Sequence, residues 1–427
     1  MIASFPAAPG RRFAIPGAAG FQGREKREFP SLRKGSGTPH HHQRVKEPME
    51  FKINSVPMAE RRPKPEDESK LGFGKIYSDH MFTMKWTQEM GWSAPTVGKF
   101  EPLTLSPAAL VLHYGQTIFE GLKAYPNQDG TINLFRAEDN CSRFNRSAAR
   151  LDLPLLDQGV MLEAIEALLE LDHEWMPRSH GTSLYIRPTM IATEPYIGLK
   201  SASEVLFFII TGPVGAYYPE GFNPVKIIVS EEYSRAGPGG LGAVKTAANY
   251  AASLLAEKEA IRAGYTQVLW LDAAERKFIE EVGAMNILFK IGGKVVSPPP
   301  GGTILDGITR DSVLKLLRSW DVPVEEYRLT IGEVIEAQAN GTLEEVFGAG
   351  TAAVISPVGH LHYQDRTYEI GGGQIGPLSL KLFDELMGIQ YGSRPDPFNW
   401  IREVAPAGMK QTPARESAST QLAMAKP

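Results

Sequence analysis

The sequence has 427 residues, of which 42% are hydrophobic and 22% charged, and its formal net charge is −4. This length exceeds the size at which a single hydrophobic core usually stops growing, so two domains are expected. The lack of a basic excess argues against a nucleic-acid partner, and no apolar run approaches the ~20 residues of a membrane helix. Cys141 is the only cysteine, which excludes an intramolecular disulfide and favours a reducing compartment, the cytoplasm.

The two ends of the chain differ in composition from the rest. Residues 1–50 are rich in Pro, Gly and Arg and lack periodicity, which predicts a disordered extension or a start codon assigned too early, with the true start near Met49. An organelle transit peptide is the alternative, because the segment is basic but has no apolar core of a secretory signal. Three adjacent histidines at 40–42 have no Cys or His partner at ligand spacing, so no metal site is predicted. Residues 404–427 indicate a loose tail.

Between these ends, short strands alternate with helices. Apolar residues at spacings of four, three and one predict a helix through residues 161–169. Further helices are predicted at 247–263, where Gly264 ends the pattern, and from Asp311 onward. Runs rich in β-branched and aromatic residues predict strands at 205–210, 226–230, 267–271 and 286–291.

The order of these elements predicts a mixed α/β (α+β) protein of two domains. Residues 213–224 are rich in Gly and Pro and indicate a connection between the domains. We therefore expect a small N-terminal α/β domain at 51–215, an interdomain loop at 216–224 and a large C-terminal domain at 225–403.

Residues 237–242 read Gly-Pro-Gly-Gly-Leu-Gly and match the spacing G-x-G-x-x-G. As a dinucleotide fingerprint, this motif would indicate an oxidoreductase, but it should leave a strand directly and open a helix. Here residues 231–236 separate it from the preceding strand, and the helix begins only after Lys245. We interpret the motif as a flexible glycine loop.

Eight segments together resemble the branched-chain amino acid aminotransferases of the type IV pyridoxal-phosphate fold. They are 112–124 (LHYGQTIFEGLKA), 132–136 (INLFR), 181–188 (GTSLYIRP), 212–217 (GPVGAY), 244–250 (VKTAANY), 280–286 (EEVGAMN), 304–310 (ILDGITR) and 347–352 (FGAGTA). Each segment alone is weak, whereas eight in the same order are improbable by chance. The resemblance extends from about Phe73 to Ile401.

This resemblance implies a fold with the cofactor between the two domains. It also implies reversible transfer of the amino group from leucine, isoleucine or valine to 2-oxoglutarate, by a ping-pong mechanism that yields branched-chain 2-oxo acids and glutamate. A D-amino acid aminotransferase or an aminodeoxychorismate lyase of the same fold remains an alternative, although the Tyr-Ile-Arg and Gly-Ala-Tyr segments favour the branched-chain enzyme. A cofactor-binding protein without catalysis is a further alternative, and a dinucleotide-dependent oxidoreductase is a distant one.

Transfer of an amino group needs a carbanion, and pyridoxal 5'-phosphate supplies the electron sink that makes it accessible. The resemblance implies that Lys245 forms the Schiff base with the cofactor, that Glu281 faces the pyridine nitrogen and that Tyr250 contacts the ring hydroxyl. Glu280 is the neighbouring candidate, but successive residues of a strand face opposite ways, so only one of the two points inward. Many relatives carry a hydroxyl residue where this chain has Ala284, which puts one hydrogen bond near the cofactor in doubt.

The phosphate group should bind at a helix start, where backbone N–H groups are free. By resemblance, Ile308 and Thr309 supply these amides and Arg136 supplies a positive charge, with a surface ion pair as the alternative for Arg136. Thr351 and Ala352 lie in the turn whose amides take the substrate carboxylate.

The substrate pocket must accept both an aliphatic side chain and the γ-carboxylate of glutamate, which an apolar wall with one arginine would allow. Arg187 is the predicted arginine, and the predicted aromatic wall consists of Phe73, Tyr114, Phe119, Tyr185 and Tyr217, with ordinary core packing as the alternative for each. The family forms homodimers, so Tyr114 and the loop at 196–199 would enter the neighbour's pocket. Some animal relatives have a redox-active Cys-x-x-Cys where this chain has Ala353 and Ser356, which favours a microbial or otherwise unregulated form.

Overall fold

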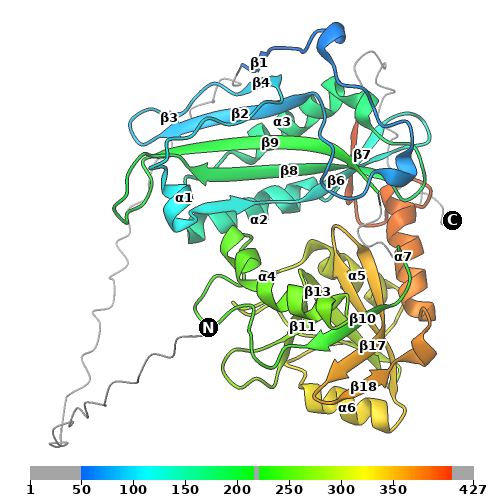
Figure 1. Ribbon diagram of the computed structural model, residues 1–427. Coiled ribbons are helices and arrows are strands. Elements are labelled where there is room, and N and C mark those ends of the chain that lie inside the picture. The colour runs from blue at the N-terminus through cyan, green and yellow to red at the C-terminus, as the bar shows by residue number, and fades with distance from the viewer. Residues whose placement is uncertain (1–49, 216–220, 406–427) are drawn as a thin grey trace, which may run out of the picture. The chain divides into compact units, whose positions relative to one another are not determined.

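The structure, a computed structural model, describes residues 50–215 and 221–405. These residues fall within one compact unit, Met49–Pro427. They form two β-sheets, each with its own helices and hydrophobic core (Figure 1). The predicted mixed α/β class is therefore confirmed.

The first sheet has ten strands among the described residues. Its order is β1-β4-β2-β9-β8-β6-β7-β19, with β3 beside β2 and β5 beside β8. The strands are β1 (Lys52–Ile53), β2 (His80–Thr87), β3 (Gly91–Trp92), β4 (Thr96–Lys99), β5 (Thr117–Phe119), β6 (Leu122–Pro126), β7 (Ile132–Phe135), β8 (Ser183–Ala192), β9 (Glu204–Val214) and β19 (Ile401–Val404). The helices are α1 (Leu110–Tyr114), α2 (Ala137–Arg150) and α3 (Gln158–Leu171), with short 3-10 turns η1 (Met58–Glu60), η2 (Glu68–Lys70) and η3 (His173–Trp175).

Apolar side chains of α2 and α3 form one core with the first sheet. Phe144 of α2 packs edge-on against Phe207 of β9, with ring centroids 5.4 Å apart, and both side chains are fully buried. The predicted helix at 161–169 is confirmed as α3, in which Ile165 and Leu168 belong to this core. Asp157 begins α3 by accepting a hydrogen bond from the Gly159 N–H, as expected of an N-cap residue.

The second sheet has nine strands within the part of the chain that the structure describes. Its order is β12-β11-β10-β17-β16-β13-β14-β15, with β18 beside β17. The strands are β10 (Val225–Val229), β11 (Gln267–Leu271), β12 (Ile279–Val282), β13 (Met285–Ile291), β14 (Lys294–Ser297), β15 (Val324–Glu326), β16 (Leu343–Gly350), β17 (Val354–Tyr363) and β18 (Arg366–Glu369). The helices are α4 (Ala247–Arg262), α5 (Ile308–Ser319), α6 (Ile331–Ala339) and α7 (Pro377–Gln390), with a 3-10 turn η4 (Gly371–Gly373).

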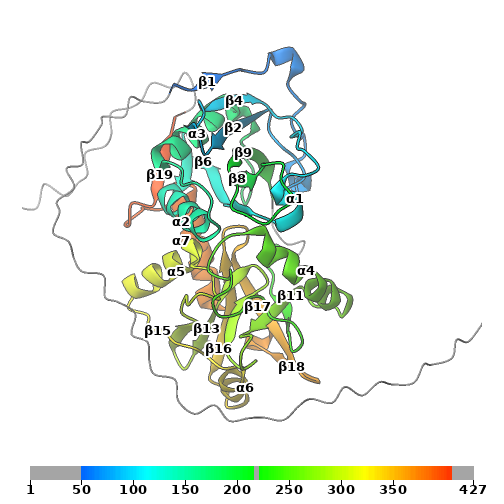
Figure 2. The same ribbon diagram turned by 90° about the vertical axis from the view of Figure 1, so that its left-hand side faces the viewer.

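Separate clusters of buried side chains attach these helices to the second sheet. Apolar residues of α5 and α7 form one cluster with β13, β16 and β17, and residues of α6 form another with the same sheet. Helix α4 packs on β11 through Ala256, Ala260 and Trp270 (Figure 2). This packing holds the starts of α4 and α5, which carry predicted site residues, against one sheet.

The strands predicted at 205–210, 226–230, 267–271 and 286–291 correspond to β9, β10, β11 and β13. Three boundaries differ from expectation. Strand β9 continues to Val214, so the connection begins later than residue 213. Helix α5 begins at Ile308, with Gly307 as its N-cap, three residues before Asp311. Strand β19, which the predicted boundaries assign largely to the second domain, pairs with β7 of the first sheet.

Several predictions fall on residues outside the described ranges. They concern the extension up to residue 49 with its histidines at 40–42, Tyr217 in the connection, and the tail beyond residue 405. Over the described ranges, no helix is both long and apolar enough to cross a membrane. The same residues contain no group of three or more His, Cys, Asp or Glu placed to hold a metal ion.

Candidate active site

A cavity of about 530 Å³ collects most of the predicted site residues. Residues attached to both sheets line it. The predicted residues among them are Phe73, Phe119, Tyr185, Arg187, Lys245, Tyr250, Glu281, Ile308, Thr309, Thr351 and Ala352. Segments far apart in the sequence thus meet at one place, as the resemblance requires.

Lys245 is held at the cavity by backbone and side-chain contacts on each side of it. Its N–H donates to Ser147 Oγ at 3.0 Å, and its carbonyl accepts from the Phe119 N–H at 3.0 Å. The amine Nζ lies 2.8 Å from the hydroxyl of Tyr250, within hydrogen-bond distance. Within the described residues, no carboxylate lies within salt-bridge distance of this amine, so it is available to a ligand of the cavity.

Glu281 lines the same cavity from β12, whereas Glu280 does not. The side chain of Glu281 is 2% exposed, and burial raises its pKa while the nearby Arg235 guanidinium lowers it. One carboxylate oxygen accepts from the Leu305 N–H at 2.7 Å. The other lies 2.6 Å from Nε of Arg235. Of the two neighbouring glutamates, the structure thus places at the cavity the one that the resemblance assigns to the ring nitrogen.

The first turn of α5 lines the cavity at Ile308 and Thr309, whose backbone N–H groups belong to the unpaired donors at a helix start. Arg143 of α2 also lines the cavity. Its Nε and Nη2 pair with the two oxygens of Glu120, at 2.7 and 2.9 Å, and its Nη1 donates to the Asp306 carbonyl at 3.1 Å. A positive side chain and free amides therefore share one wall, a combination that suits an anion.

Arg136 does not line the cavity. It is the N-cap of α2, with a left-handed backbone (φ 52°), and its Nε pairs with Asp139 at 2.7 Å. Its Nη1 pairs with Asp311 at 2.6 Å and donates to the Ile308 carbonyl at 3.1 Å. The structure therefore places Arg136 behind the start of α5, in an ion-pair network.

Aromatic rings and one arginine form another part of the cavity wall. The guanidinium carbon of Arg187 lies 4.6 Å from the ring centroid of Phe119 and 5.2 Å from that of Tyr185. Nη2 of Arg187 donates to the Tyr185 hydroxyl at 2.9 Å, and the ring of Phe73 meets Tyr185 edge-on at 4.9 Å. Gly121 leaves room for this wall, because a Cβ there would overlap the Tyr185 hydroxyl and displace its ring.

The cavity has features of a binding site for a charged aromatic group. The buried Nε of Arg187 has no hydrogen-bond partner among the described residues, which costs free energy unless a ligand supplies one. Helix amides with Arg143, an amine at Lys245 and a carboxylate at Glu281 match the phosphate, carbonyl and ring nitrogen of a pyridoxal phosphate. The residues present therefore fit that cofactor.

Comparisons with known proteins agree with this donor set. Residues 117–361 match the family described as Amino-transferase class IV. The chain belongs to the class IV aminotransferase family. Over 345 residues, it is 50% identical to branched-chain-amino-acid aminotransferase 2 of Bacillus subtilis (strain 168), and the match covers 81% of this chain and 95% of the relative.

Two solved structures also resemble this class IV aminotransferase. The branched-chain amino acid aminotransferase of Escherichia coli is 25% identical, with a TM-score of 0.63, over 75% of this chain and 99% of that one. The T.th. branched-chain amino acid aminotransferase complexed with N-(5'-phosphopyridoxyl)-L-glutamate is 26% identical, with a TM-score of 0.61, over 75% and 98%. The predicted family is confirmed, and these similarities favour none of the alternative activities.

Two charged residues of this aminotransferase site were missed by sequence reasoning. Arg143 lines the cavity, whereas Arg235 forms an ion pair with Glu281 without lining the cavity itself. A signal for Arg143 existed, because it lies on the same helical face as Asn140, Phe144 and Ser147, all of them buried. An arginine on a buried face needs a partner or a ligand.

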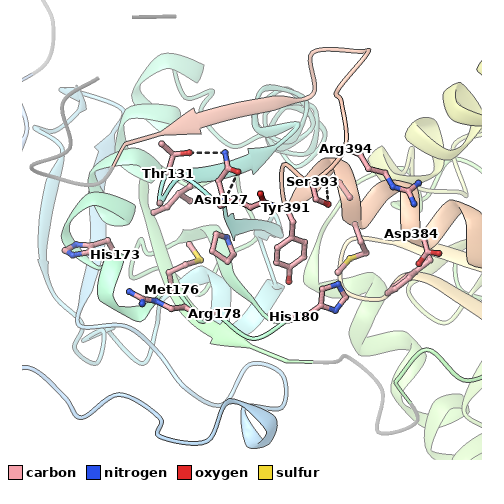
Figure 3. Close-up of a pocket in the computed structure, with 17 residues that line it drawn as sticks. Asn127, Thr131, His173, Met176, Arg178, His180, Asp384, Tyr391, Ser393 and Arg394 are labelled. Atoms are coloured by element: carbon pink, nitrogen blue, oxygen red, sulfur yellow. Dashed lines mark hydrogen bonds between the residues drawn. The ribbon is translucent and has the colours of Figure 1, made fainter. Parts of the chain in front are cut away.

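A second, larger cavity of about 760 Å³ shares no lining residue with the active site of this aminotransferase. Figure 3 shows its polar side chains, with Arg178 and Arg394 on opposite sides of Tyr391. Arg394 is already paired with Glu385. The two arginines thus do not face one another across the cavity. Although this cavity is larger than the first, its side chains do not indicate a particular ligand.

Proposed function

We propose that this aminotransferase moves the amino group of leucine, isoleucine or valine to 2-oxoglutarate, reversibly. The observation that supports this most is the wall of the cavity, where Arg187 lies between the rings of Phe119 and Tyr185. The rings suit an aliphatic side chain, and the guanidinium suits the γ-carboxylate of glutamate. The relatives whose names carry this activity, at about 50% identity, support the same substrate class.

We further propose pyridoxal 5'-phosphate as the cofactor, which when bound supplies the electron sink for the carbanion. Lys245 would hold it covalently, and Tyr250, whose hydroxyl lies 2.8 Å from the lysine amine, would contact its ring hydroxyl. The Glu281 carboxylate would accept a hydrogen bond from the protonated ring nitrogen and keep it protonated. The amides of Ile308 and Thr309 would take the phosphate, and those of the turn at 350–352 the substrate carboxylate.

For the phosphate, we propose that Arg143 supplies the positive charge in place of Arg136. A guanidinium has five N–H groups, and the hydrogen bonds of Arg143 to Glu120 and Asp306 use three of them. Two therefore remain for phosphate oxygens, on a side chain that lines the cavity. Arg136 lacks such access, because its contacts to Asp139 and Asp311 lie outside the cavity.

We also propose a homodimer. The α4 surface exposes Leu254, Leu255 and Ile261, each more than half exposed. Tyr114 does not line the cavity but lies on the surface, and its hydroxyl donates to the Ile197 carbonyl of the exposed loop 196–199. A second copy would cover these apolar side chains and bring Tyr114 toward a neighbouring site. The cytoplasmic location stays a prediction.

One assay tests the proposed activity. Purified protein is mixed with L-leucine and 2-oxoglutarate in the presence of pyridoxal phosphate, and glutamate is measured. The wild type should form glutamate, and Lys245→Ala should not. Turnover of D-alanine without turnover of L-leucine would favour the D-amino acid aminotransferase, and release of pyruvate from aminodeoxychorismate would favour the lyase.

Borohydride reduction tests the covalent residue separately. It should fix one cofactor per chain on the peptide that contains Lys245, without any substrate. A label on another lysine would contradict the assignment of Lys245 while leaving the reaction class intact.

A further inference from the structure

We infer that Arg235 is a positioning residue, which keeps Glu281 ionised and in place and ties it to the loop that carries Lys245. This inference rests on the proposed cofactor, because it assigns a task to Glu281 at the ring nitrogen. Arg235 does not line the cavity, so it acts through its neighbours rather than on the ligand.

The guanidinium of Arg235 joins three segments of the chain. Its Nε lies 2.6 Å from Oε2 of Glu281 on β12. Its Nη1 donates to the Gly242 carbonyl at 3.2 Å and to the Thr303 carbonyl at 2.9 Å. The side chain of Arg235 is 6% exposed and that of Glu281 is 2% exposed, so water screens this ion pair little.

Both loops that Arg235 holds lead directly to the site. Gly242 stands three residues before Lys245, and Thr303 stands two residues before Leu305, whose N–H donates to Glu281 at 2.7 Å. The two loops pack so closely that a Cβ at Gly242 would overlap the Thr303 backbone. The glycine-rich motif at 237–242 thereby gains a role: it lets the lysine loop approach the loop that contacts Glu281.

The charges around Glu281 explain why it needs a cation. Burial raises the pKa of this carboxyl, and the buried Glu280 raises it further, whereas Arg235 and Lys245 lower it. Glu280 is itself 5% exposed, and burial and the nearby Asp272 raise its pKa, while Arg235 and Arg328 lower it. Lys245 acts on Glu281 only through space, whereas Arg235 is the cation in direct contact with that carboxylate.

The proposed test replaces Arg235 by glutamine, which can still donate a hydrogen bond but carries no charge. Nitrogen-15 NMR of ring-labelled pyridoxal phosphate, bound to the full-length protein, reports whether the ring nitrogen is protonated. We expect a protonated nitrogen in the wild type and an unprotonated one in Arg235→Gln, as in Glu281→Gln. The dissociation constant of the cofactor should rise about tenfold or more, because a charge-assisted contact is weakened.

Two further variants separate this role from general stability. Arg235→Lys retains the charge and should restore the protonated signal. Arg310→Gln is the matched control, because Arg310 is 4% exposed and pairs with Glu326 at 2.8 Å in the same half of the chain. It should lower the melting temperature without changing the nitrogen signal. If Arg235→Gln does not fold, an unprotonated nitrogen in Arg235→Lys would still overturn the inference.

The outcomes distinguish this inference from the proposed function. A wild type that binds no pyridoxal phosphate would overturn both. A wild type that binds it, together with an Arg235→Gln variant whose nitrogen signal and cofactor affinity are unchanged, would overturn only the role of Arg235. Turnover gives an independent check, because Arg235→Gln should add little to the loss in Glu281→Gln if it acts through that residue alone.

Discussion

Replacing Arg143 by glutamine should weaken cofactor binding and destabilise the fold at the same time. Loss of charge-assisted hydrogen bonds, worth about 1.5–3 kcal/mol, should raise the dissociation constant of pyridoxal phosphate by roughly ten- to a hundredfold. The same change leaves Glu120, whose side chain is 0% exposed, without its cation. Breaking such a buried pair costs about 3–5 kcal/mol of the free energy of unfolding.

A second substitution separates these two effects. In Arg143→Gln combined with Glu120→Gln, the buried carboxylate is neutral, so most of the stability should return. The cofactor affinity should stay low, because the positive charge is still missing. Titration of the apoprotein with pyridoxal phosphate measures the affinity, and urea unfolding of the apoprotein measures the stability.

Arg136→Gln is the contrasting variant. Its carboxylate partners Asp139 and Asp311 are 51% and 36% exposed, so water solvates them when the arginine is lost. We expect a loss of about 1 kcal/mol in stability and little change in cofactor affinity. If Arg136→Gln weakens cofactor binding tenfold and Arg143→Gln does not, the phosphate contact belongs to Arg136 and the assignment of Arg143 is wrong.

Three other predictions concern single side chains. Arg187→Ala should weaken the half-reaction with 2-oxoglutarate by roughly ten- to a hundredfold and that with leucine less; single-turnover absorbance separates the two, and equal losses would show that Arg187 only supports the pocket. Mild peroxide followed by a thiol reductant should leave activity unchanged, because burial raises the pKa of the Cys141 thiol to about 12 and the thiolate is the reactive form; a large, reversible loss of activity would contradict this. Burial lowers the pKa of Lys123 to about 8, from 10.5, so its charged form destabilises the native state below pH 8. The unfolding free energy of the wild type, relative to Lys123→Met, should therefore rise by about 3 kcal/mol between pH 8 and 10.5 in urea unfolding, and a difference independent of pH would refute the reasoning.

Local patterns predicted much of the fold. Periodicity and end signals correctly predicted the helices that contain Ile165 and Ala256. They also predicted the strands at 226–230 and 267–271 to within one residue. Lys245 and Glu281 were singled out by the family motif, because burial does not separate Glu281 from its neighbours: all four residues of β12 are buried. The sequence predicts the start of α5 three residues too late, because the N-cap residue Gly307 has no side chain that would mark it.

The charged partners could not be predicted in the same way. Arg136 and Arg143 lie seven residues apart, close to two helical turns, so the sequence places both on one side of α2 without showing which reaches the cavity. Which of the two arginines reaches the cavity depends on how α2 packs against β5 and how α5 packs against the second sheet. Arg235 pairs with Glu281 across 46 positions of the chain, and only the tertiary structure brings them together.

The pairing of β19 with β7 has a consequence for the order in which the protein folds during synthesis. Among the described residues, β7 is the last strand but one of the first sheet, and β19 (Ile401–Val404) covers its outer edge. Trp400 leads into β19, where its carbonyl accepts from the Arg136 N–H and its ring packs on Phe135. While the ribosome is still translating the second half, β7 therefore has an open edge able to pair with strands of other nascent chains. A chain truncated before residue 400 should therefore aggregate, and not merely lose its activity.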